Sequence, residues 1–349
     1  MAGRRLEVAY VTRPTSIAYL TGFHAEPHER LMALAVRPGE ATLIVPSLEE
    51  EKAQARASDA KVVAWRDGED PYRLVAQAVG GGAEIAVEKD HLTVRAAEVV
   101  TSRTGASELV DIAPEIRRLR LRKGADEIET LARAAAITDE AFVRALARLR
   151  AGASEIEVAL MFGAAIGELG ASLSFATLAQ SGPNSAMPHL EPSTRKLSKG
   201  DLVLLDFGAA VDGYKADSTR MAVIGEPTAR HREIHDVVLR AHDAAIAAVR
   251  PGVTTGEVDA AARRVIDAAG YGKNFFHRIG HGLGLEAHED PSLDPGSTTP
   301  LEPGMVFTIE PGVYVPGYGG VRIEDDVVVT EDSVRVLTKA DRSLHVVTS

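Results

Sequence analysis

The sequence predicts a mixed α/β (α+β) chain in which a small α/β domain precedes a larger domain built from two similar halves. Three observations support this fold class. The 349 residues are long for a single core. Short apolar runs alternate with helical segments in the first third of the chain. A helix–strand pattern that ends on an acidic residue then occurs twice. We therefore assign residues 1–115 to a first domain, 116–124 to a linker and 125–349 to a second domain.

The first domain is predicted to be a sheet flanked by helices. Residues 32–36 and 42–45 have the apolar composition of strands, and residues 48–57 have that of a helix. Its ionisable residues are scattered and suggest neither a metal site nor a nucleophile. The arginine-rich segment 114–123 is typical of a solvated linker or a charged helix face. A long helix is predicted over residues 125–150, which are rich in Ala, Leu, Glu and Arg.

The second domain contains an internal repeat. Residues 151–158 correspond to residues 251–258, and each segment has a capping box that begins a helix, Ser154 with Glu157 and Thr254 with Glu257. Further along, residues 197–208 correspond to residues 301–312. The sequence therefore predicts two equivalent halves related by a pseudo-twofold axis, with their strand ends meeting at a central cleft.

The repeated strands end on carboxylates. The apolar run 202–205 leads into Asp206, and the second copy places Glu310 at the same position. Asp217 follows Asp206 after a turn that contains glycine. Burying several carboxylates together is costly unless a proton or a cation lies between them. The pattern therefore predicts a metal site.

Two further groups extend the candidate metal site. Glu324 follows a second apolar segment, and residues 280–291 contain His281 and His288. Oxygen ligands with one imidazole suit manganese, cobalt, iron or zinc in a paired site. Taken singly, Asp217 is more typical of a turn residue, His281 of a tight turn and His288 of a core histidine. These simpler interpretations weaken because all the candidate ligands fall at strand or turn positions of one repeated unit.

Composition excludes several classes of function. A net charge of −11 argues against nucleic acid or an anionic membrane as the main partner. The chain has no cysteine, which excludes disulfides, thiolate zinc sites and cysteine nucleophiles. No stretch approaches the roughly 20 apolar residues of a membrane span. We expect a cytoplasmic protein.

With these motifs the chain resembles the pita-bread metallopeptidases, in particular the branch of Xaa-Pro dipeptidase (prolidase) and aminopeptidase P. The resemblance covers most of the chain, because residues 19–23 are similar to part of the family's N-terminal domain. Segment 181–189 matches a motif that carries a further histidine, His189. Five motifs carry metal ligands: Asp206 in Leu-Asp-Phe-Gly-Ala, Asp217 in Ala-Asp-Ser-Thr-Arg, His281 in His-Gly-Leu-Gly-Leu, Glu310 in Ile-Glu-Pro-Gly-Val-Tyr and Glu324 in Arg-Ile-Glu-Asp.

The resemblance implies two divalent ions per subunit, manganese, cobalt or zinc, with manganese favoured. Asp206 would bind one ion, His281 and Glu310 the other, and Asp217 and Glu324 would bridge both. A hydroxide shared by the ions would attack the carbonyl group that precedes proline.

The resemblance also implies catalytic roles. Glu310 would carry protons, and His189 and His288 would bind the substrate or the oxyanion. Arg322 would orient the carboxylates.

The implied partners are small peptides with proline at the second position, and the resemblance favours a homodimer. Some prolidases carry an arginine where this chain has Ser292, so a carboxylate reader is expected elsewhere, for instance at Arg30 or Arg37. The segment from His281 to His288 lacks the insertion of some aminopeptidases P, which favours a dipeptidase. The alternatives are an aminopeptidase P and, more remotely, a non-catalytic pita-bread protein that binds peptides or proteins.

Overall fold

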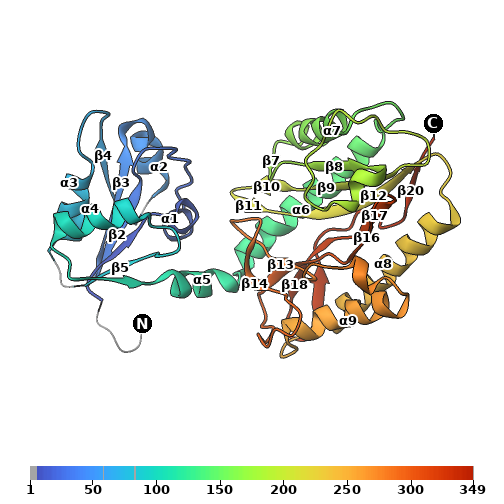
Figure 1. Ribbon diagram of the computed structural model, residues 1–349. Coiled ribbons are helices and arrows are strands. Elements are labelled where there is room, and N and C mark those ends of the chain that lie inside the picture. The colour runs from blue at the N-terminus through green and yellow to red at the C-terminus, as the bar shows by residue number, and fades with distance from the viewer. Residues whose placement is uncertain (1–5, 58, 82–83, 349) are drawn as a thin grey trace. The chain divides into compact units, whose positions relative to one another are not determined.

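The structure is a computed structural model that describes residues 6–57, 59–81 and 84–348, and the chain divides into two compact units, Met1–Arg120 and Leu121–Ser349 (Figure 1). The segment predicted as a linker is partly helical, because helix α5 spans Ala113–Leu121. On this helix Arg118 is exposed, as expected for a charged helix face, whereas Arg120 is buried together with Ile116.

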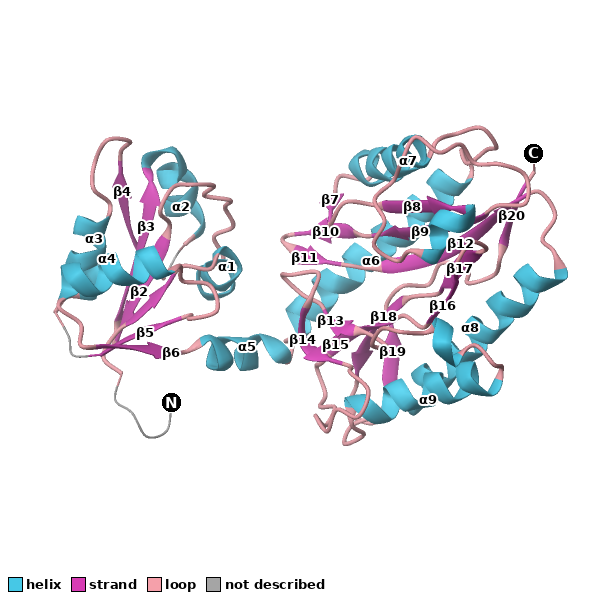
Figure 2. Ribbon diagram, viewed as in Figure 1, coloured by secondary structure: helices cyan, strands magenta, loops and turns pink. Residues whose placement is uncertain are grey.

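Unit 1 is a sheet with helices on both faces. The strand order is β4-β3-β2-β1-β5-β6. The strands are β1 (Ala9–Val11), β2 (Ala33–Arg37), β3 (Glu40–Pro46), β4 (Lys61–Trp65), β5 (Glu84–Val87) and β6 (Glu108–Asp111), and the helices are α1 (Pro14–Thr21), η1 (Ser47–Glu49), α2 (Glu50–Arg56), α3 (Tyr72–Val79) and α4 (Val94–Thr104). Alternate residues of β2 face two separate cores, with Ala33 and Ala35 packing toward α3 and α4 and Leu34 toward α1 and α2. Figure 2 shows these four helices flanking the strands of unit 1. This alternation of apolar residues explains the two-sided sheet.

Unit 2 consists of two similar halves. The first half contains α6 (Ala125–Leu146), α7 (Glu155–Glu168), β7 (Ser172–Leu173), β8 (Leu178–Ser181), η2 (Gly182–Ala186), β9 (Leu202–Phe207), β10 (Ala209–Val211), β11 (Tyr214–Lys215) and β12 (Ser218–Ile224). The second half contains α8 (Ala229–Ala248), α9 (Thr255–Ala268), η3 (Gly272–Asn274), β13 (His281–Gly282), β14 (Glu289–Ser292), β15 (Val306–Ile309), β16 (Gly312–Val315), β17 (Gly319–Arg322), β18 (Asp325–Val329) and β19 (Val334–Val336), and β20 (His345–Val347) follows.

Each half contributes one main sheet. The sheet of the first half has the order β20-β12-β9-β8, and that of the second has the order β14-β13-β15-β18-β19. A three-stranded sheet, β11-β10-β7, and the β16-β17 hairpin complete the unit. The apolar faces of α8 and α9 pack on one core, and α6 and α7 contribute to another. None of the helices in the described part of the chain combines the length and hydrophobicity needed to cross a bilayer.

The repeat predicted from the sequence extends to individual hydrogen bonds. The Gly152 amide donates to the Leu197 carbonyl at 2.8 Å, and the Gly252 amide donates to the Leu301 carbonyl at the same distance. Both predicted capping boxes form, at the starts of α7 and α9. Helix α6 ends at Leu146, four residues before the predicted end, where the Arg148 and Leu149 amides donate to the carbonyls three residues earlier, at Ala145 and Leu146.

Candidate metal centre and substrate pocket

Three of the predicted metal ligands gather at the point where the two halves meet. Asp206 lies near the end of β9, and Asp217 immediately precedes β12. Thr219 pairs with Asp206 across β9 and β12, and it also forms an isolated bridge with Glu324 of the second half. This bridge places the acids of one half directly against those of the other.

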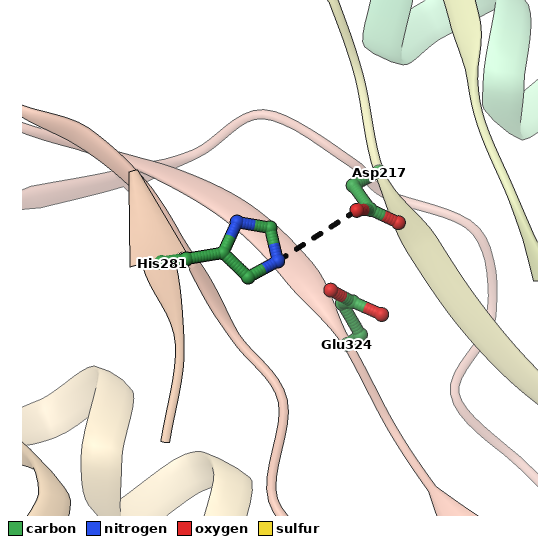
Figure 3. Close-up of side chains that lie close together, drawn as sticks. All are labelled: Asp217, His281 and Glu324. Carbon is green, nitrogen blue, oxygen red and sulfur yellow. Dashed lines mark ion pairs between the residues drawn. The ribbon is translucent and has the colours of Figure 1, made fainter. Parts of the chain in front are cut away.

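His281 points at the carboxylates. Ligand atoms of Asp217, His281 and Glu324 all lie within 4.8 Å of one another, and all three residues are buried. The His281 Nε2 atom is 3.9 Å from Asp217 Oδ2 and 3.4 Å from Glu310 Oε1. Figure 3 shows the imidazole facing both Asp217 and Glu324. One imidazole and several carboxylate oxygens therefore converge on a small buried volume.

Glycines allow His281 to approach this volume. A Cβ atom on Gly280 would lie 1.9 Å from the Thr308 carbonyl oxygen, and one on Gly282 would lie 2.1 Å from that of Asp290. Only glycine fits at both positions. The His281 amide donates to Thr308 Oγ1 at 3.1 Å. Close packing of the backbone thus fixes the histidine against strand β15.

Arg322 connects the carboxylates of the two halves. Its Nη2 donates to Asp206 Oδ2 at 2.5 Å, and its Nε donates to Thr219 Oγ1 at 3.0 Å. The same Nε lies 3.7 Å from Glu324 Oε2. Thr219 Oγ1 in turn donates to Glu324 Oε2 at 2.6 Å. Arg322 and Thr219 therefore hold one oxygen of each acid in place.

The protein's own cations and hydrogen-bond donors only partly balance the negative charge of the clustered carboxylates. Burial raises the pKa of Asp206, Asp217 and Glu324, and neighbouring carboxylates add to the rise for the last two. Burial likewise raises the pKa of Glu310 to about 7. Asp206 Oδ1 and Asp217 Oδ1 are buried without a hydrogen-bond partner. These unpartnered oxygens are what a bound cation would satisfy.

The state of His281 also suits a metal ligand. Burial, with the nearby His288, lowers the pKa of His281 to about 3, so the ring is neutral near pH 7. Its Nδ1 lies 3.2 Å from the Gly282 carbonyl oxygen, which is an acceptor. The proton therefore belongs on Nδ1 and the lone pair on Nε2, toward the acids. Four carboxylates with one neutral imidazole fit divalent transition ions.

A pocket of about 700 Å³ opens onto this cluster. Its lining includes five of the residues predicted from the sequence: His189, His281, His288, Glu310 and Arg322. His189 and His288 are exposed, and the His288 ring lies 4.0 Å from the ring of His281, between centroids. Asp206, Asp217 and Glu324 are not among the lining residues and lie buried behind it.

The pocket also contains residues that the sequence analysis missed. Phe276, His277 and Arg278 form part of its wall, next to Met187, Pro188 and Leu190. His277 Nε2 lies 3.0 Å from the Tyr314 hydroxyl, which also contacts Arg322. In the sequence, the only indication of these pocket residues was that Arg278 lies three residues before the candidate ligand His281.

The loop that carries His189 is held by two buried polar side chains. The Gln180 Nε2 atom lies 2.9, 3.1 and 2.9 Å from the carbonyl oxygens of Met187, Pro188 and Leu190. Glu155 has no exposed surface. Its carboxylate accepts hydrogen bonds from the following donors: the amides and hydroxyls of Ser181 and Ser193 and the side chain of Asn184. Both contacts fix the loop at the pocket rim.

Comparison with known proteins gives the chain a family. Residues 129–331 match the model of metallopeptidase family M24, and residues 1–122 match the creatinase/prolidase N-terminal domain. An Xaa-Pro dipeptidase from Lactobacillus helveticus is 39% identical, over 98% of this chain and 95% of the relative.

Two solved structures are similar along nearly the whole chain. The prolidase from Pyrococcus furiosus is 36% identical, with a TM-score of 0.89 and coverage of 97% of each chain. An X-Pro aminopeptidase from Thermotoga maritima is 32% identical, with a TM-score of 0.90 and coverage of 98% of each chain. The chain therefore belongs to metallopeptidase family M24, and it is a hydrolytic enzyme with the fold of the prolidase and aminopeptidase P branch.

Proposed function

We propose that the enzyme hydrolyses the bond before proline in Xaa-Pro dipeptides. The observation that carries this proposal is the cluster of four carboxylates, three of them buried, and one neutral imidazole at the base of the pocket. Similarity to an Xaa-Pro dipeptidase over 98% of the chain supports the substrate class.

We further propose that two divalent ions are held by five ligands: Asp206, Asp217, His281, Glu310 and Glu324. When bound, such ions supply Lewis acidity that activates water near neutral pH and polarises the scissile carbonyl. The oxygen-rich donor set supports manganese as the metal, in preference to cobalt or zinc. The homodimer and the cytoplasmic location remain predictions.

Glu310 is the proposed proton carrier. Its side chain is 14% exposed and lines the pocket, so one carboxylate oxygen can face the substrate and the attacking water. It takes a proton from the attacking water and gives one to the proline nitrogen as the peptide bond breaks. His189 and His288 bind the substrate at the rim, and Arg322 keeps Asp206 oriented.

An aminopeptidase P activity is the second candidate, supported by the similarity to the T. maritima X-Pro aminopeptidase. Both activities break the same bond, and they differ in whether the proline that follows it has a free carboxylate.

The test compares alanyl-proline with alanyl-prolyl-alanine after EDTA treatment and reloading with manganese, cobalt or zinc. We expect uptake of about two ions per chain, activity that depends on the metal, and faster cleavage of the dipeptide. Faster cleavage of the tripeptide would favour the aminopeptidase. A chain that takes up no divalent metal and cleaves neither peptide would be a binding protein instead.

A further inference from the structure

A second buried arginine lies behind the candidate metal ligands. Arg220, in β12, has no exposed surface and is not among the residues that line the pocket. It follows Thr219, whose hydroxyl contacts Glu324, so its own side chain extends from the opposite face of the strand. A guanidinium buried away from water is costly unless its N–H groups have partners. The partners of Arg220 therefore show what it holds in place.

The Arg220 guanidinium joins main-chain groups of both halves. Its Nη1 donates to the Thr219 carbonyl of the first half at 3.0 Å and to the Glu324 carbonyl of the second half at 2.6 Å. The Glu324 amide donates to the same Thr219 carbonyl at 3.2 Å. Both main-chain polar groups of Glu324 are therefore held from the first half. The Arg220 Nε donates to the Ala340 carbonyl, in the C-terminal segment 338–342, at 3.1 Å.

Asp325 is the counter-ion of Arg220. It has no exposed surface, and its Oδ1 accepts from Arg220 Nη2 at 2.6 Å and from Thr338 Oγ1 at 2.7 Å. Its Oδ2 accepts from Arg342 Nε at 2.5 Å and lies 3.0 Å from His242 Nε2. Each carboxylate oxygen has two lone pairs, and each has two partners here. Asp325 is therefore saturated by protein groups, in contrast to the unpartnered oxygens of the candidate ligands.

The C-terminal segment also reaches a second candidate ligand. The Asp326 amide donates to Thr338 Oγ1 at 3.0 Å, and the Asp326 carboxylate accepts from the Asp217 amide at 2.9 Å. A single residue, Asp326, therefore connects the segment to the main chain of Asp217. Through Arg220 and Asp326 the segment supports both of the proposed bridging ligands from the side away from the pocket.

We propose that Arg220 and Asp325 are positioning residues that hold the main chain of Glu324, and that the C-terminal segment, which binds both of them, sets the affinity of the site for divalent ions. This inference rests on the ligand set of the proposed function and adds what keeps the two halves aligned at that set. Partners that orient metal ligands typically change metal affinity or activity by 10- to 100-fold when they are lost.

Manganese titration of the metal-free protein tests the inference without a substrate. Arg220→Lys keeps the charge, but one ammonium cannot reproduce the planar fork that reaches Asp325 and two carbonyls. Asp325→Asn keeps the shape and removes the charge. We expect the manganese affinity per folded chain to fall by about 10- to 100-fold in each. The two changes together should cost little more than the larger one alone, because they disrupt the same set of contacts.

Arg342→Ala is the decisive variant, because its side chain is 30% exposed and the fold tolerates its loss better than that of a fully buried group. Its manganese affinity should fall by about tenfold, the lower end of that range, and Arg342→Lys should recover part of the loss. Arg195→Ala is the matched control. Its side chain is 29% exposed and pairs with Asp201 at 2.6 Å, and it forms no hydrogen bond or ion pair with a candidate ligand among the described residues.

Arg195→Ala should lower the melting temperature of the metal-free protein and keep the wild-type manganese affinity. Arg342→Ala should change the affinity as well. An unchanged affinity in Arg342→Ala would overturn the inference whatever the two buried variants do, because the contacts of the C-terminal segment would then only stabilise the fold.

Hydrolysis of alanyl-proline separates this inference from the proposed function. At limiting manganese, kcat of Arg342→Ala should fall and excess manganese should restore it, whereas KM should stay at the wild-type value because the pocket is unchanged. If the wild type hydrolyses neither test peptide but Arg342→Ala binds manganese more weakly, the proposed function fails and the inference stands. If the wild type hydrolyses the dipeptide but Arg342→Ala binds manganese as tightly, the proposed function stands and the inference fails.

Discussion

The two halves of unit 2 share a backbone arrangement, but equivalent positions in them carry side chains with different roles. Ser181 lies opposite Val203 in the first half, and Gly282 lies opposite Phe307 in the second. Since Asp206 and Glu310 occupy corresponding strand positions, Gln180 and His281 also correspond. The imidazole of His281 faces the buried acids, whereas the amide of Gln180 holds the loop that carries His189. The repeat therefore sets the position of each side chain in the fold. The type of residue at that position determines whether it faces the candidate metal site or supports the substrate pocket.

The starts of the repeated helices show the same division. Glu155 begins α7 and accepts from Ser193 Oγ at 2.6 Å, and Thr255 begins α9 and donates to Ser297 Oγ at 2.7 Å. Glu155 also binds Ser181 and Asn184, on the side of the His189 loop. Both halves therefore have a hydrogen bond from the helix start to a serine. In the first half, the Glu155 carboxylate makes additional hydrogen bonds that hold the loop at the pocket rim.

The largest expected effect comes from removing an acid from either half. Asp217→Ala and Glu324→Ala should each abolish activity, by more than the 10- to 100-fold that loss of an outer-shell partner typically costs. Both remove a proposed bridging ligand, so metal content should fall in each while circular dichroism stays native. Asp332→Ala, an exposed acid, is the control. Near wild-type turnover of either variant with metal supplied would contradict the two-metal assignment.

Metal binding should depend on pH, because an incoming ion must displace a proton from the clustered carboxylates. The raised pKa of Glu310, about 7, means that the metal-free protein holds a proton there below pH 7, and a metal ion must displace it. His281, with a pKa of about 3, has no proton to release from Nε2. Apparent manganese affinity should therefore rise with pH between 5.5 and 7, by up to about tenfold per unit for each displaced proton. Calorimetry in two buffers of different ionisation enthalpy measures the protons. Binding at pH 6 without proton release would refute this linkage.

Gln180→Ala should lower kcat/KM by roughly tenfold, because three carbonyl contacts that hold the His189 loop are lost. The change should be absent when His189→Ala is already present, since Gln180 acts through that loop. Metal content should stay at the wild-type level, in contrast to His281→Gln, which makes the second half resemble the first. Additive effects of the two alanine variants would show that Gln180 only supports the fold.

The smallest effects are expected at the helix starts, and their difference sharpens the comparison. Glu155→Gln replaces an acceptor oxygen with a donor against buried N–H and O–H groups, which should destabilise the fold by about 2 kcal/mol. Thr255→Val removes one hydrogen bond in the equivalent place and should cost about 1 kcal/mol. Denaturant unfolding of the metal-free protein measures both free energies. Equal losses would mean that the first half has no special anchor.

Local patterns explain why much of this architecture was predictable. Some features are encoded within a few neighbouring residues, for example the capping box of Ser154 with Glu157 and the strands that end on acidic residues. Because these local patterns occur twice, the sequence alone indicated two similar halves. The residues proposed as ligands lie together because the two halves meet at the bridge between Thr219 and Glu324, as the repeat predicted. The positions of Arg278 and Gln180 were not predictable, because they depend on contacts with Ser292 and with the loop at 187–190 that only the folded chain creates.

The bridge between Thr219 and Glu324 has a consequence for engineering. Thr219 belongs to one half and Glu324 to the other, so the cluster of acids is completed only when both halves are present. A fragment that ends before α8 retains Asp206 and Asp217 but has lost His281, Glu310 and Glu324. Cleavage of the chain between β12 and α8 would separate these ligands, so recovery of metal binding on mixing the two fragments would report their reassembly.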